Sequence, residues 1–447
     1  MSAADPLELL SGLVGRARRA GADAADAVLV DSVSLSVAWR LGQLERLERS
    51  EGGDVGLRVL IGRRQAMVSS SDRSQAALDE LVERAVAMAR RVPEDPFAGL
   101  AGSDQVATEV PDLDICDPAE PEAEAMIGQL RRAEEAARSI EGVTNSEGAE
   151  GSWSRSQVAF AASNGFARTY GVSSGALSVS VLAGDAASGM ERDYDYTSAV
   201  FLSDLRPPEE VGLEAGRRAV RRLGSRKVRT CKVPVVYDPR VSRGLVSSLA
   251  SAINGAAVAR GTSFLKDRLG KAVFAPGIRV VDDPLRRRGM RSRPFDGEGL
   301  PSRRLAVVED GVLNTWLLDL RSARQLGMVS TGSAGRGTSS PPSPGASNLY
   351  LEPGPVTVAE LIGDIPCGFY VTELFGHGIN GVTGDYSRGA AGFWIEGGEI
   401  ADPVSEVTVA GNLKDIFRNL TPASDLAFRY GIDAPTVRID GLTVAGR

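Results

Sequence analysis

The chain has 447 residues, with 51 lysines and arginines against 58 aspartates and glutamates, and its formal net charge is −7. A mildly acidic protein of this size has no general attraction for nucleic acid or for an anionic membrane surface, so neither is expected as a partner. Its apolar runs are too short to span a bilayer.

The first part of the chain alternates between helical and strand patterns. Apolar residues recur at helical spacing in residues 6–20, and the stripes in residues 74–91 and 120–140 predict two further amphipathic helices. Apolar and polar residues alternate in residues 28–40 and 55–61, which is typical of half-buried strands. An N-terminal unit with helices and a mixed sheet is therefore expected.

A domain boundary is expected near residue 225. Strand patterns dominate residues 157–182, and residues 207–223 return to a helix whose acidic start and arginine-rich end suit the helix dipole. We therefore predict an N-terminal α+β domain over residues 1–225 and a C-terminal β-rich domain over residues 226–447. Prolines near residues 93–118 allow the first domain to have two sub-parts.

The second half opens with a strand pattern at residues 232–238 and one long helix rich in small residues at 239–258. From residue 278 onward, short strands and turns are expected. Residues 330–347 consist mainly of serine, glycine and proline, and this composition predicts a mobile loop. The expected fold class is α+β.

The start of the chain and its cysteines bear on the compartment. Residues 1–6 lack the charged segment followed by an apolar run that a secretory signal shows. Cys116, Cys231 and Cys367 are widely spaced and odd in number, which favours reduced thiols over a disulfide framework. A cytoplasmic location is therefore expected.

The chain has one histidine, His377, and it lies in the glycine-rich segment 372–395. Hydrolytic zinc sites usually take at least two imidazoles, so a lone histidine excludes most of them. The glycines indicate backbone geometry that side chains would block, as turns and binding surfaces require. This segment is therefore predicted to form a site in a chain that is short of catalytic groups.

Two enzyme motifs match formally. Residues 376–381 fit G-x-G-x-x-G, but no helical pattern follows, so turn chemistry is favoured over a dinucleotide site. Residues 171–175 fit the G-x-S-x-G nucleophile motif, which must stand between a strand and a helix, whereas a strand pattern follows here. A serine hydrolase that uses Ser173 and His377 is kept as an alternative function.

Two charged segments also carry alternatives. The basic run at residues 286–293 is predicted to be a solvated loop or a docking surface for an acidic partner. The second possibility is the only sequence support for a regulatory protein-binding module. Residues 191–196 interleave carboxylates and phenols, and they fit either the wall of a polar groove or an exposed hairpin end.

Residues 369–400 (FYVTELFGHGINGVTGDYSRGAAGFWIEGGEI) resemble the signature of the TldD/PmbA family, and specifically its PmbA side, also called TldE. Members of this family have also been labelled modulators of DNA gyrase. The resemblance spans nearly the whole chain. Shorter segments that agree with it are residues 54–59, 192–196, 294–299, 317–324, 330–335 and 437–444.

The resemblance implies a role in a two-subunit zinc metallopeptidase that cleaves unfolded or modified peptides. In that family a TldD-type subunit holds zinc through a His-Glu-x-x-x-His helix and a later cysteine. A PmbA-type subunit lacks these ligands and completes a chamber. Residues 246–251, which would align with the zinc helix, contain no imidazole or carboxylate, and no cysteine follows Thr408.

We therefore expect a non-catalytic subunit with no cofactor of its own, a TldD-type partner that holds the zinc, and a homodimer when the chain is alone. No catalytic or metal-binding residue is assigned. A metal site built from His377, Cys367 and Glu373 is the less favoured alternative. Glycine-flanked backbone near His377 is expected to pair with extended peptide. The predicted substrate-binding residues are His377, Asn380, Thr383, Asp385, Tyr386, Ser387 and Arg388.

Overall fold

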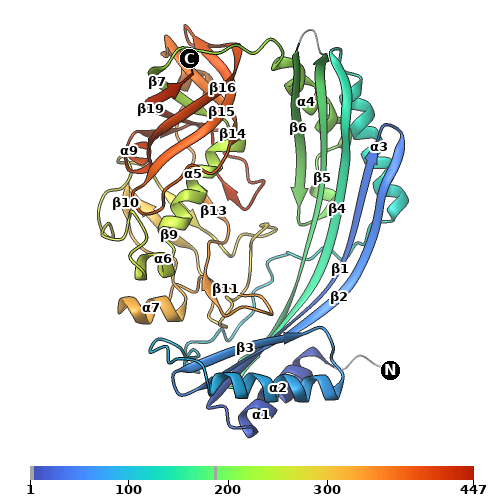
Figure 1. Ribbon diagram of the computed structural model, residues 1–447, viewed down its shortest axis with the longest axis vertical. Coiled ribbons are helices and arrows are strands. Elements are labelled where there is room, and N and C mark those ends of the chain that lie inside the picture. The colour runs from blue at the N-terminus through green and yellow to red at the C-terminus, as the bar shows by residue number, and fades with distance from the viewer. Residues whose placement is uncertain (1–4, 186–188, 447) are drawn as a thin grey trace.

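The computed structural model describes residues 5–185 and 189–446. A long curved sheet with helices on one face forms the N-terminal part, and a compact β-rich part stands beside its other face (Figure 1). The sheet has six strands in the order β3-β2-β1-β4-β5-β6, and it is antiparallel throughout rather than mixed. Its strands are β1 (Ala24–Arg40), β2 (Gln43–Ile61), β3 (Arg64–Ser70), β4 (Val143–Ala162), β5 (Ala167–Asp185) and β6 (Gly189–Ala199).

Two pairs of helices cover opposite ends of the same sheet face. Leu29 of β1 packs in the core beneath α1 and α2, whereas Leu35 packs in the core beneath α3 and α4. Because successive side chains of a strand point to opposite faces, these residues mark the helix-covered face. The bounds are α1 (Pro6–Arg19), α2 (Gln75–Ala89), α3 (Ala123–Arg138) and α4 (Pro208–Arg221), close to the predicted ranges.

The C-terminal part contains two main sheets around one core. The larger has the order β16-β15-β14-β7-β19-β17, with β7 parallel to β14, and the smaller has the order β10-β9-β8-β13-β18. The larger sheet consists of β7 (Cys231–Tyr237), β14 (Cys367–Phe375), β15 (Asp385–Glu396), β16 (Glu399–Asn412), β17 (Leu420–Pro422) and β19 (Val437–Ala445). The smaller consists of β8 (Val280–Asp282), β9 (Leu305–Glu309), β10 (Val312–Leu313), β13 (Leu349–Leu351) and β18 (Ile432–Asp433).

Helices and strands are thus segregated in both parts, and the α+β class is confirmed. The remaining short elements are η1 (Leu202–Asp204), α7 (Leu320–Leu326), α8 (Val358–Gly363) and α9 (Leu413–Arg418). Within the described residues, none of the helices combines the length and the apolarity that a bilayer span requires.

The single long helix expected at residues 239–258 is wrong, because the structure breaks it into α5 (Pro239–Ala252) and α6 (Gly255–Ala259). The Asn254 side chain caps α6 by accepting from the backbone N–H groups of Ala256 and Ala257 at 3.0 and 3.2 Å. The N–H of Gly255 donates to the carbonyl of Leu317 at 2.9 Å. A Cβ at Gly255 would lie 2.8 Å from that oxygen, so this contact requires glycine. A distant segment therefore ends the helix.

The mobile loop expected at residues 330–347 is wrong for most of its length. Ser330 and Thr331 are buried, and both hydroxyls donate to the carbonyl of Leu318, at 3.0 and 3.2 Å. Arg336 reaches Asp26 of β1 at 2.6 Å. The segment also pairs with itself through β11 (Ala334–Gly335) and β12 (Ser343–Pro344). Serine-rich composition does not produce mobility here, because tertiary bonds satisfy the hydroxyls.

Arginines join the C-terminal part to the N-terminal part. The basic run at residues 286–293 belongs to this set, because Arg288 bonds Asp114 at 2.7 Å and Asp204 at 3.0 Å. Part of that run is thus bound within the chain, although Arg287, Arg288 and Arg291 stay exposed to solvent. Further bridges are Arg222 with Glu373, Arg240 with Asp193 at 2.8 Å, Arg321 with Asp95 at 2.6 Å, and Arg336 with Asp26 at 2.6 Å.

Candidate functional site

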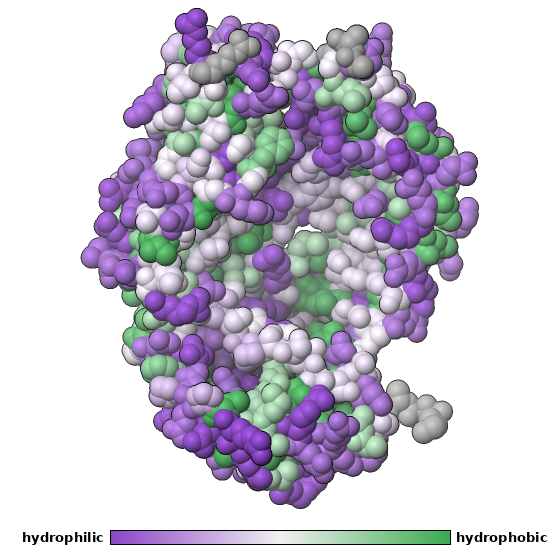
Figure 2. All heavy atoms as spheres, viewed as in Figure 1, coloured by the Kyte–Doolittle hydropathy of each residue, from purple (hydrophilic) through white to green (hydrophobic). Residues whose placement is uncertain are grey.

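The helix-free face of the long sheet is lined by serines. Leu35 and Val37 of β1 face the helices. Because successive side chains of a strand point to opposite faces, Ser34 points the other way, toward the C-terminal part. Ser50, Ser34, Ser154 and Ser174 lie opposite one another on β2, β1, β4 and β5, and the last two hydroxyls are 3.0 Å apart. The space-filling view shows a hollow on this side, lined mainly by pale surface of intermediate hydropathy (Figure 2). The wall is polar but carries little charge.

Across this hollow, one face of α5 lines two adjoining cavities of about 440 and 370 Å³. Both include Gly244, Ser247 and Arg388, so they form one cleft, which we call the α5 cleft. Ser251 lines the larger cavity. Residues 244, 247 and 251 share one side of the helix because they are spaced by three and four positions. The opposite side, with Leu245, Val246 and Leu249, is buried in the core.

Topology places α5 beside the predicted segment. Strands β7 and β14 are parallel neighbours, so their carboxyl ends meet at one edge of the sheet. Helix α5 follows β7, and the loop of residues 376–384 follows β14 at the same edge. Ile379 and Gly381 of this loop line the larger cavity together with Ser251.

The α5 face offers no activated nucleophile. The Ser247 hydroxyl donates to the carbonyl of Arg243 at 3.1 Å, and the Ser251 hydroxyl donates to the carbonyl of Ser247 at 3.1 Å. Neither hydroxyl has an imidazole or carboxylate partner among the described residues. Activation of a serine needs an adjacent base, so these groups are suited to contact rather than to covalent catalysis.

Charged side chains line the smaller cavity of the cleft. Arg240 bonds Asp193 of β6 at 2.8 Å, and Glu373 of β14 bonds Arg222, the residue directly after α4. Burial alone would lower the pKa of Arg240, but the charge and hydrogen bond of Asp193, together with the charge of Asp238, outweigh burial and hold that pKa above its usual range. Tyr194 also lines this cavity. This position agrees with the prediction that residues 191–196 form the wall of a polar groove.

The loop that carries the predicted site is bonded internally. The Asn380 side chain accepts from the N–H groups of Val382 and Thr383 at 2.9 and 3.3 Å. Thr383 donates its hydroxyl to Asp385 at 2.6 Å, and this bond holds the pKa of Asp385 below its usual range. The N–H of Ser387 donates to the carbonyl of Gly378 at 2.7 Å. Part of this backbone is therefore already paired within the chain, and the pairing of the rest with added peptide stays a prediction.

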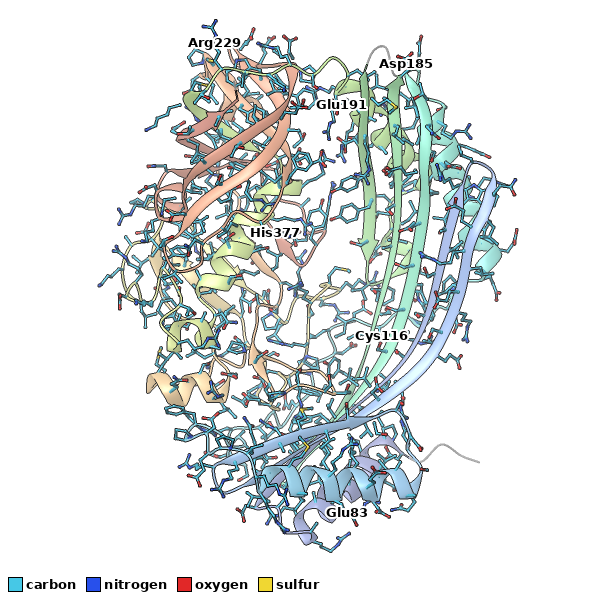
Figure 3. The ribbon with its side chains drawn as sticks, in the orientation of Figure 1. Glu83, Cys116, Asp185, Glu191, Arg229 and His377 are labelled. Carbon is cyan, nitrogen blue, oxygen red and sulfur yellow. The ribbon has the colours of Figure 1, made fainter. Side chains whose placement is uncertain are left out.

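The predicted substrate-binding residues share one hairpin but differ in environment. His377 is exposed and lies on the side of the C-terminal part that faces the long sheet (Figure 3). Tyr386 is buried beside Tyr237, and burial raises the pKa of both phenols. Of the seven, Arg388 alone lines both cavities of the α5 cleft. The roles of the others remain predictions.

The sequence reasoning missed the α5 residues that line the cleft. Their signal was the spacing of Gly244, Ser247 and Ser251 on the side of the helix opposite a leucine and valine stripe. Arg243 was missed as well, because a single arginine in a helix carries no distinguishing pattern.

The structure contradicts the serine hydrolase alternative. Ser173 is buried in the middle of β5, where its hydroxyl donates to the carbonyl of Val200 at 2.9 Å. The same oxygen accepts from the N–H of Asp117 at 2.7 Å. A nucleophile elbow requires a turn between a strand and a helix, whereas Ser173 lies within the continuous strand β5. His377 is not among the hydrogen-bond partners of Ser173.

The structure does not assemble the alternative metal site either. Cys367 is exposed at the start of β14, and Glu373 at the other end is bonded to Arg222. In residues 5–185 and 189–446, no three histidine, cysteine, aspartate or glutamate side chains are placed to hold a metal ion. Zinc prefers nitrogen, sulfur and carboxylate ligands, so glycine and serine on the α5 face do not fit it.

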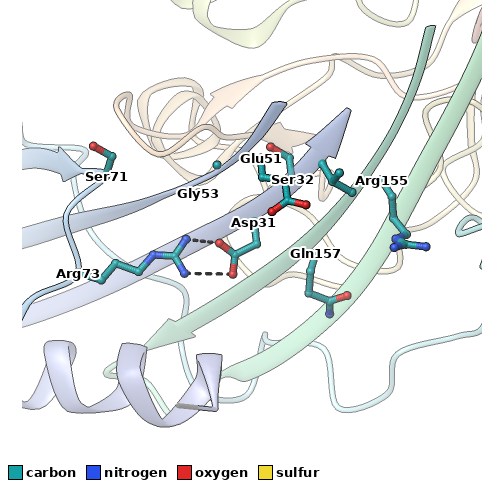
Figure 4. Close-up of a pocket in the computed structure, with 10 residues that line it drawn as sticks. Asp31, Ser32, Glu51, Gly53, Ser71, Arg73, Arg155 and Gln157 are labelled. Carbon is teal, nitrogen blue, oxygen red and sulfur yellow. Dashed lines mark hydrogen bonds and ion pairs between the residues drawn. The ribbon is translucent and has the colours of Figure 1, made fainter. Parts of the chain in front are cut away.

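A further cavity of about 550 Å³ lies on the other, helix-bearing face of the long sheet (Figure 4). Its lining includes Asp31 and Arg73, which are paired with each other, and Arg155, whose guanidinium donates to the carbonyl of Pro118 at 3.0 Å. This cavity occupies the gap between the two helix pairs. It is separated from the α5 cleft by the sheet.

The fold and the cleft define an α+β protein with a hollow between a polar sheet wall and a C-terminal core. Three family models match consecutive parts of the chain. They are PmbA/TldA metallopeptidase domain 1 at residues 25–89, the central domain at 116–223 and the C-terminal domain at 230–446. The chain therefore belongs to the PmbA/TldD family of metallopeptidases.

Individual relatives agree with this assignment. The chain is 38% identical over 443 residues to the metalloprotease PmbA of Escherichia coli O157:H7, covering 99% of this chain and 94% of that protein. A solved protein from Bacteroides thetaiotaomicron, described as a "putative modulator of DNA gyrase", matches with a TM-score of 0.92 at 26% identity and full coverage of both chains. TldE from Thermococcus kodakarensis shares the fold, with a TM-score of 0.87 at 19% identity, over 98% of this chain and 99% of that one.

A more distant relative belongs to the other branch of the family. The metalloprotease TldD homolog of Buchnera aphidicola is 23% identical over 286 residues, which cover 59% of this chain and 58% of that protein.

Proposed function

We propose that this chain is the zinc-free subunit of a two-subunit peptidase, in which it holds an unfolded peptide while a TldD-type homologue supplies the zinc. The α5 cleft carries the proposal. In a family of metallopeptidases, the helix face that lines this cleft presents glycine and serine where zinc ligands would be needed.

The geometry suits a binding role. The hollow is bounded on one side by the serine wall and on the other by the α5 cleft (Figure 2). Hydroxyls can both donate to and accept from peptide backbone, so a wall of serines can hold an extended peptide. Holding an extended substrate near a metal-bound water lowers the entropic barrier of hydrolysis. Zinc in the partner would polarise the scissile carbonyl and activate water.

The regulatory-module alternative loses part of its support. Its only basis was the arginine run at residues 286–293, and Arg288 of that run is bonded to Asp114 and Asp204 within the chain. No other described feature favours it over the peptidase role.

The proposal is tested by measuring zinc content and hydrolysis of an unstructured peptide. The purified chain is assayed alone and mixed with the TldD-type homologue from the same genome. We expect no stoichiometric zinc in this chain after dialysis, no cleavage by the chain alone, and cleavage by the mixture. Stoichiometric zinc together with cleavage by this chain alone would overturn the proposal.

A cleft-filling variant tests the binding role directly. Ser247→Trp places a large ring in both cavities of the cleft without removing a core residue. We expect the complex to assemble and to cleave at about a tenth of the normal rate or less, because the substrate is displaced. Ser11→Trp, at an exposed position of α1, is the matched control and should leave the rate unchanged.

A further inference from the structure

The α5 cleft contains more positive than negative charge. The charged residues that line its smaller cavity are three arginines, Arg240, Arg243 and Arg388, and one glutamate, Glu373. Arg240 is neutralised by Asp193, and Glu373 is bonded to Arg222 from outside the cavity. This pairing leaves two guanidinium groups to be accounted for.

Neither of the remaining arginines forms an ion pair with a carboxylate in the described parts of the chain. Arg243 donates its Nε to the carbonyl of Arg240 at 3.2 Å, and its guanidinium lies 4.4 Å from the centre of the Tyr430 ring. Arg388 donates its Nε to the carbonyl of Phe375 at 3.1 Å. Each Nε is thus held by backbone, and both side chains line the cavity without a carboxylate partner.

One carboxylate lies near Arg243 without neutralising it. Asp433 accepts from the backbone N–H groups of Arg429, Tyr430 and Gly431 at 3.0, 2.9 and 3.1 Å. These three donors occupy both of its oxygens, so Asp433 fixes the turn that presents Tyr430 to Arg243. The ring in turn holds the guanidinium at the rim of the cleft.

Two fixed guanidinium groups at one cavity are a receptor for a carboxylate. The planar fork of arginine matches the two oxygens of a carboxylate, and charge-assisted bonds of this kind are stronger than neutral ones. A protein of net charge −7 does not attract anions in general, so binding of an anion at the cleft depends on a local excess of positive charge such as this one.

We propose that Arg243 and Arg388 bind a carboxylate of the peptide substrate, and that this cleft therefore selects peptides by negative charge. The inference rests on the proposed function, because it names the substrate class for the same site. Two sources share this chemistry, namely the C-terminal carboxylate of a peptide and the side chains of aspartate or glutamate within it.

Binding of three labelled, unstructured peptides to the full chain tests the inference. The first has a free C-terminal carboxylate and no acidic residue, the second has the same sequence with a C-terminal amide, and the third is an amide with two internal glutamates. We expect the first or the third peptide to bind about fivefold or more tightly than the second. The one that does so identifies the source of the carboxylate.

Variants then assign the effect to the two arginines. Arg243→Gln and Arg388→Gln should each remove most of the preference, and Arg388→Lys should retain part of it because the charge remains. Arg84→Gln, at an exposed position of α2, is the control and should keep the full preference. Thermal unfolding of each variant checks that its fold is intact.

The outcomes separate this inference from the proposed function. Equal affinity of the three peptides for the wild-type chain overturns the inference, even if the mixture with a TldD-type homologue cleaves peptide. A charge preference that is lost in both glutamine variants supports the inference, even if that mixture cleaves nothing. Absence of any peptide binding, alone and in the mixture, counts against both.

Discussion

Asp26 shows how a single buried residue joins the two parts of the chain. It is 0% exposed and contacts two guanidinium groups, that of Arg58 on β2 and that of Arg336 in the segment of residues 330–347. Burial alone would raise the pKa of Asp26, but the charges of Arg336 and Arg58 outweigh it and lower that pKa. Asp26 therefore stays ionised between two buried cations.

Replacing Asp26 by asparagine should destabilise the fold strongly. Asp26→Asn leaves two buried guanidinium groups without a counter-charge, which typically costs about 3–5 kcal/mol. Asp31→Asn on the same strand is the control, because its pair with Arg73 is 42% and 31% exposed and should contribute less than about 1 kcal/mol. Urea denaturation measures both. Equal losses for the two variants would contradict the role of burial.

Asp282 makes the stability of the fold depend on pH. It is buried, and its Oδ1 accepts from the N–H and the hydroxyl of Ser347 at 2.8 and 2.9 Å. Burial raises the pKa of Asp282 to about 6, although the bonds from Ser347 oppose the shift. Because the folded pKa exceeds the unfolded one, the folded state binds the proton more tightly. The stability that this group contributes at low pH is therefore lost as the pH rises from about 4 through 6.

The predicted consequence is measured with Asp282→Asn, whose amide oxygen can still accept both bonds from Ser347. The wild type should lose about 2 kcal/mol relative to this variant between pH 4 and pH 7, in addition to changes that both proteins share. Urea denaturation at each pH gives the difference. A difference that is independent of pH would show that Asp282 does not titrate in this range.

At the scale of elements, helices α3 and α4 pack so closely that they require glycine. A Cβ at Gly212 of α4 would lie 2.0 Å from the carbonyl oxygen of Ala133 of α3, and one at Gly216 would lie 2.7 Å from that of Ala137. The two helices therefore touch through backbone, and their spacing is fixed by these positions.

Gly212→Ala should destabilise the protein by about 1–3 kcal/mol, because the helices must separate to admit the methyl group. Gly128→Ala on α3 is the opposite case, since no atom lies within 4 Å of the added Cβ. That substitution should stabilise the protein by about 0.5–1 kcal/mol through helix propensity. Thermal or urea unfolding of the two variants gives the sign of each change, and a stabilised Gly212→Ala would refute the close packing.

The same scale explains which elements the sequence could predict. Helices α1 to α4 bury one stripe against the sheet, so their periodicity marks them to within about three residues. The outer half of β2, residues 43–54, is almost fully exposed and has no alternation, and only pairing with β1 makes it a strand. The helix break at Asn254 and the ordered segment 330–347 likewise depend on distant partners, Leu317 and Asp26.

At the scale of the whole molecule, the candidate site is assembled from segments that are far apart in the sequence. The glycines around His377 could mark one of them, because they signal unusual backbone. Arg243 and Ser247 could not be recognised in the same way. They reach the site only because β7 and β14 are parallel neighbours and β6 stands across the hollow. The local sequence pattern of a segment does not show which distant segments will lie beside it in the fold.

Asp193 connects the long sheet to the helix that lines the cleft. It lies on β6 with its side chain 4% exposed. It bonds Arg240 of α5 at 2.8 Å and approaches Arg222, the residue directly after α4, at 3.6 Å. One buried carboxylate thus holds the N-terminal sheet against the helix that lines the cleft. Loss of this charge should weaken the contact between the two parts of the chain more than it weakens the hydrophobic core of either part.

We therefore predict that Asp193→Asn makes unfolding less cooperative. The wild type should unfold in urea with coincident transitions by circular dichroism and by hydrogen exchange of the α5 amides, because the two parts are coupled. In the variant, the α5 amides should lose protection at lower urea than the strands of the long sheet. Asp402→Asn, whose pair with Arg226 is 67% exposed on the aspartate side, should behave like the wild type. Coincident transitions in Asp193→Asn would mean that the remaining arginine bridges suffice to couple the two parts.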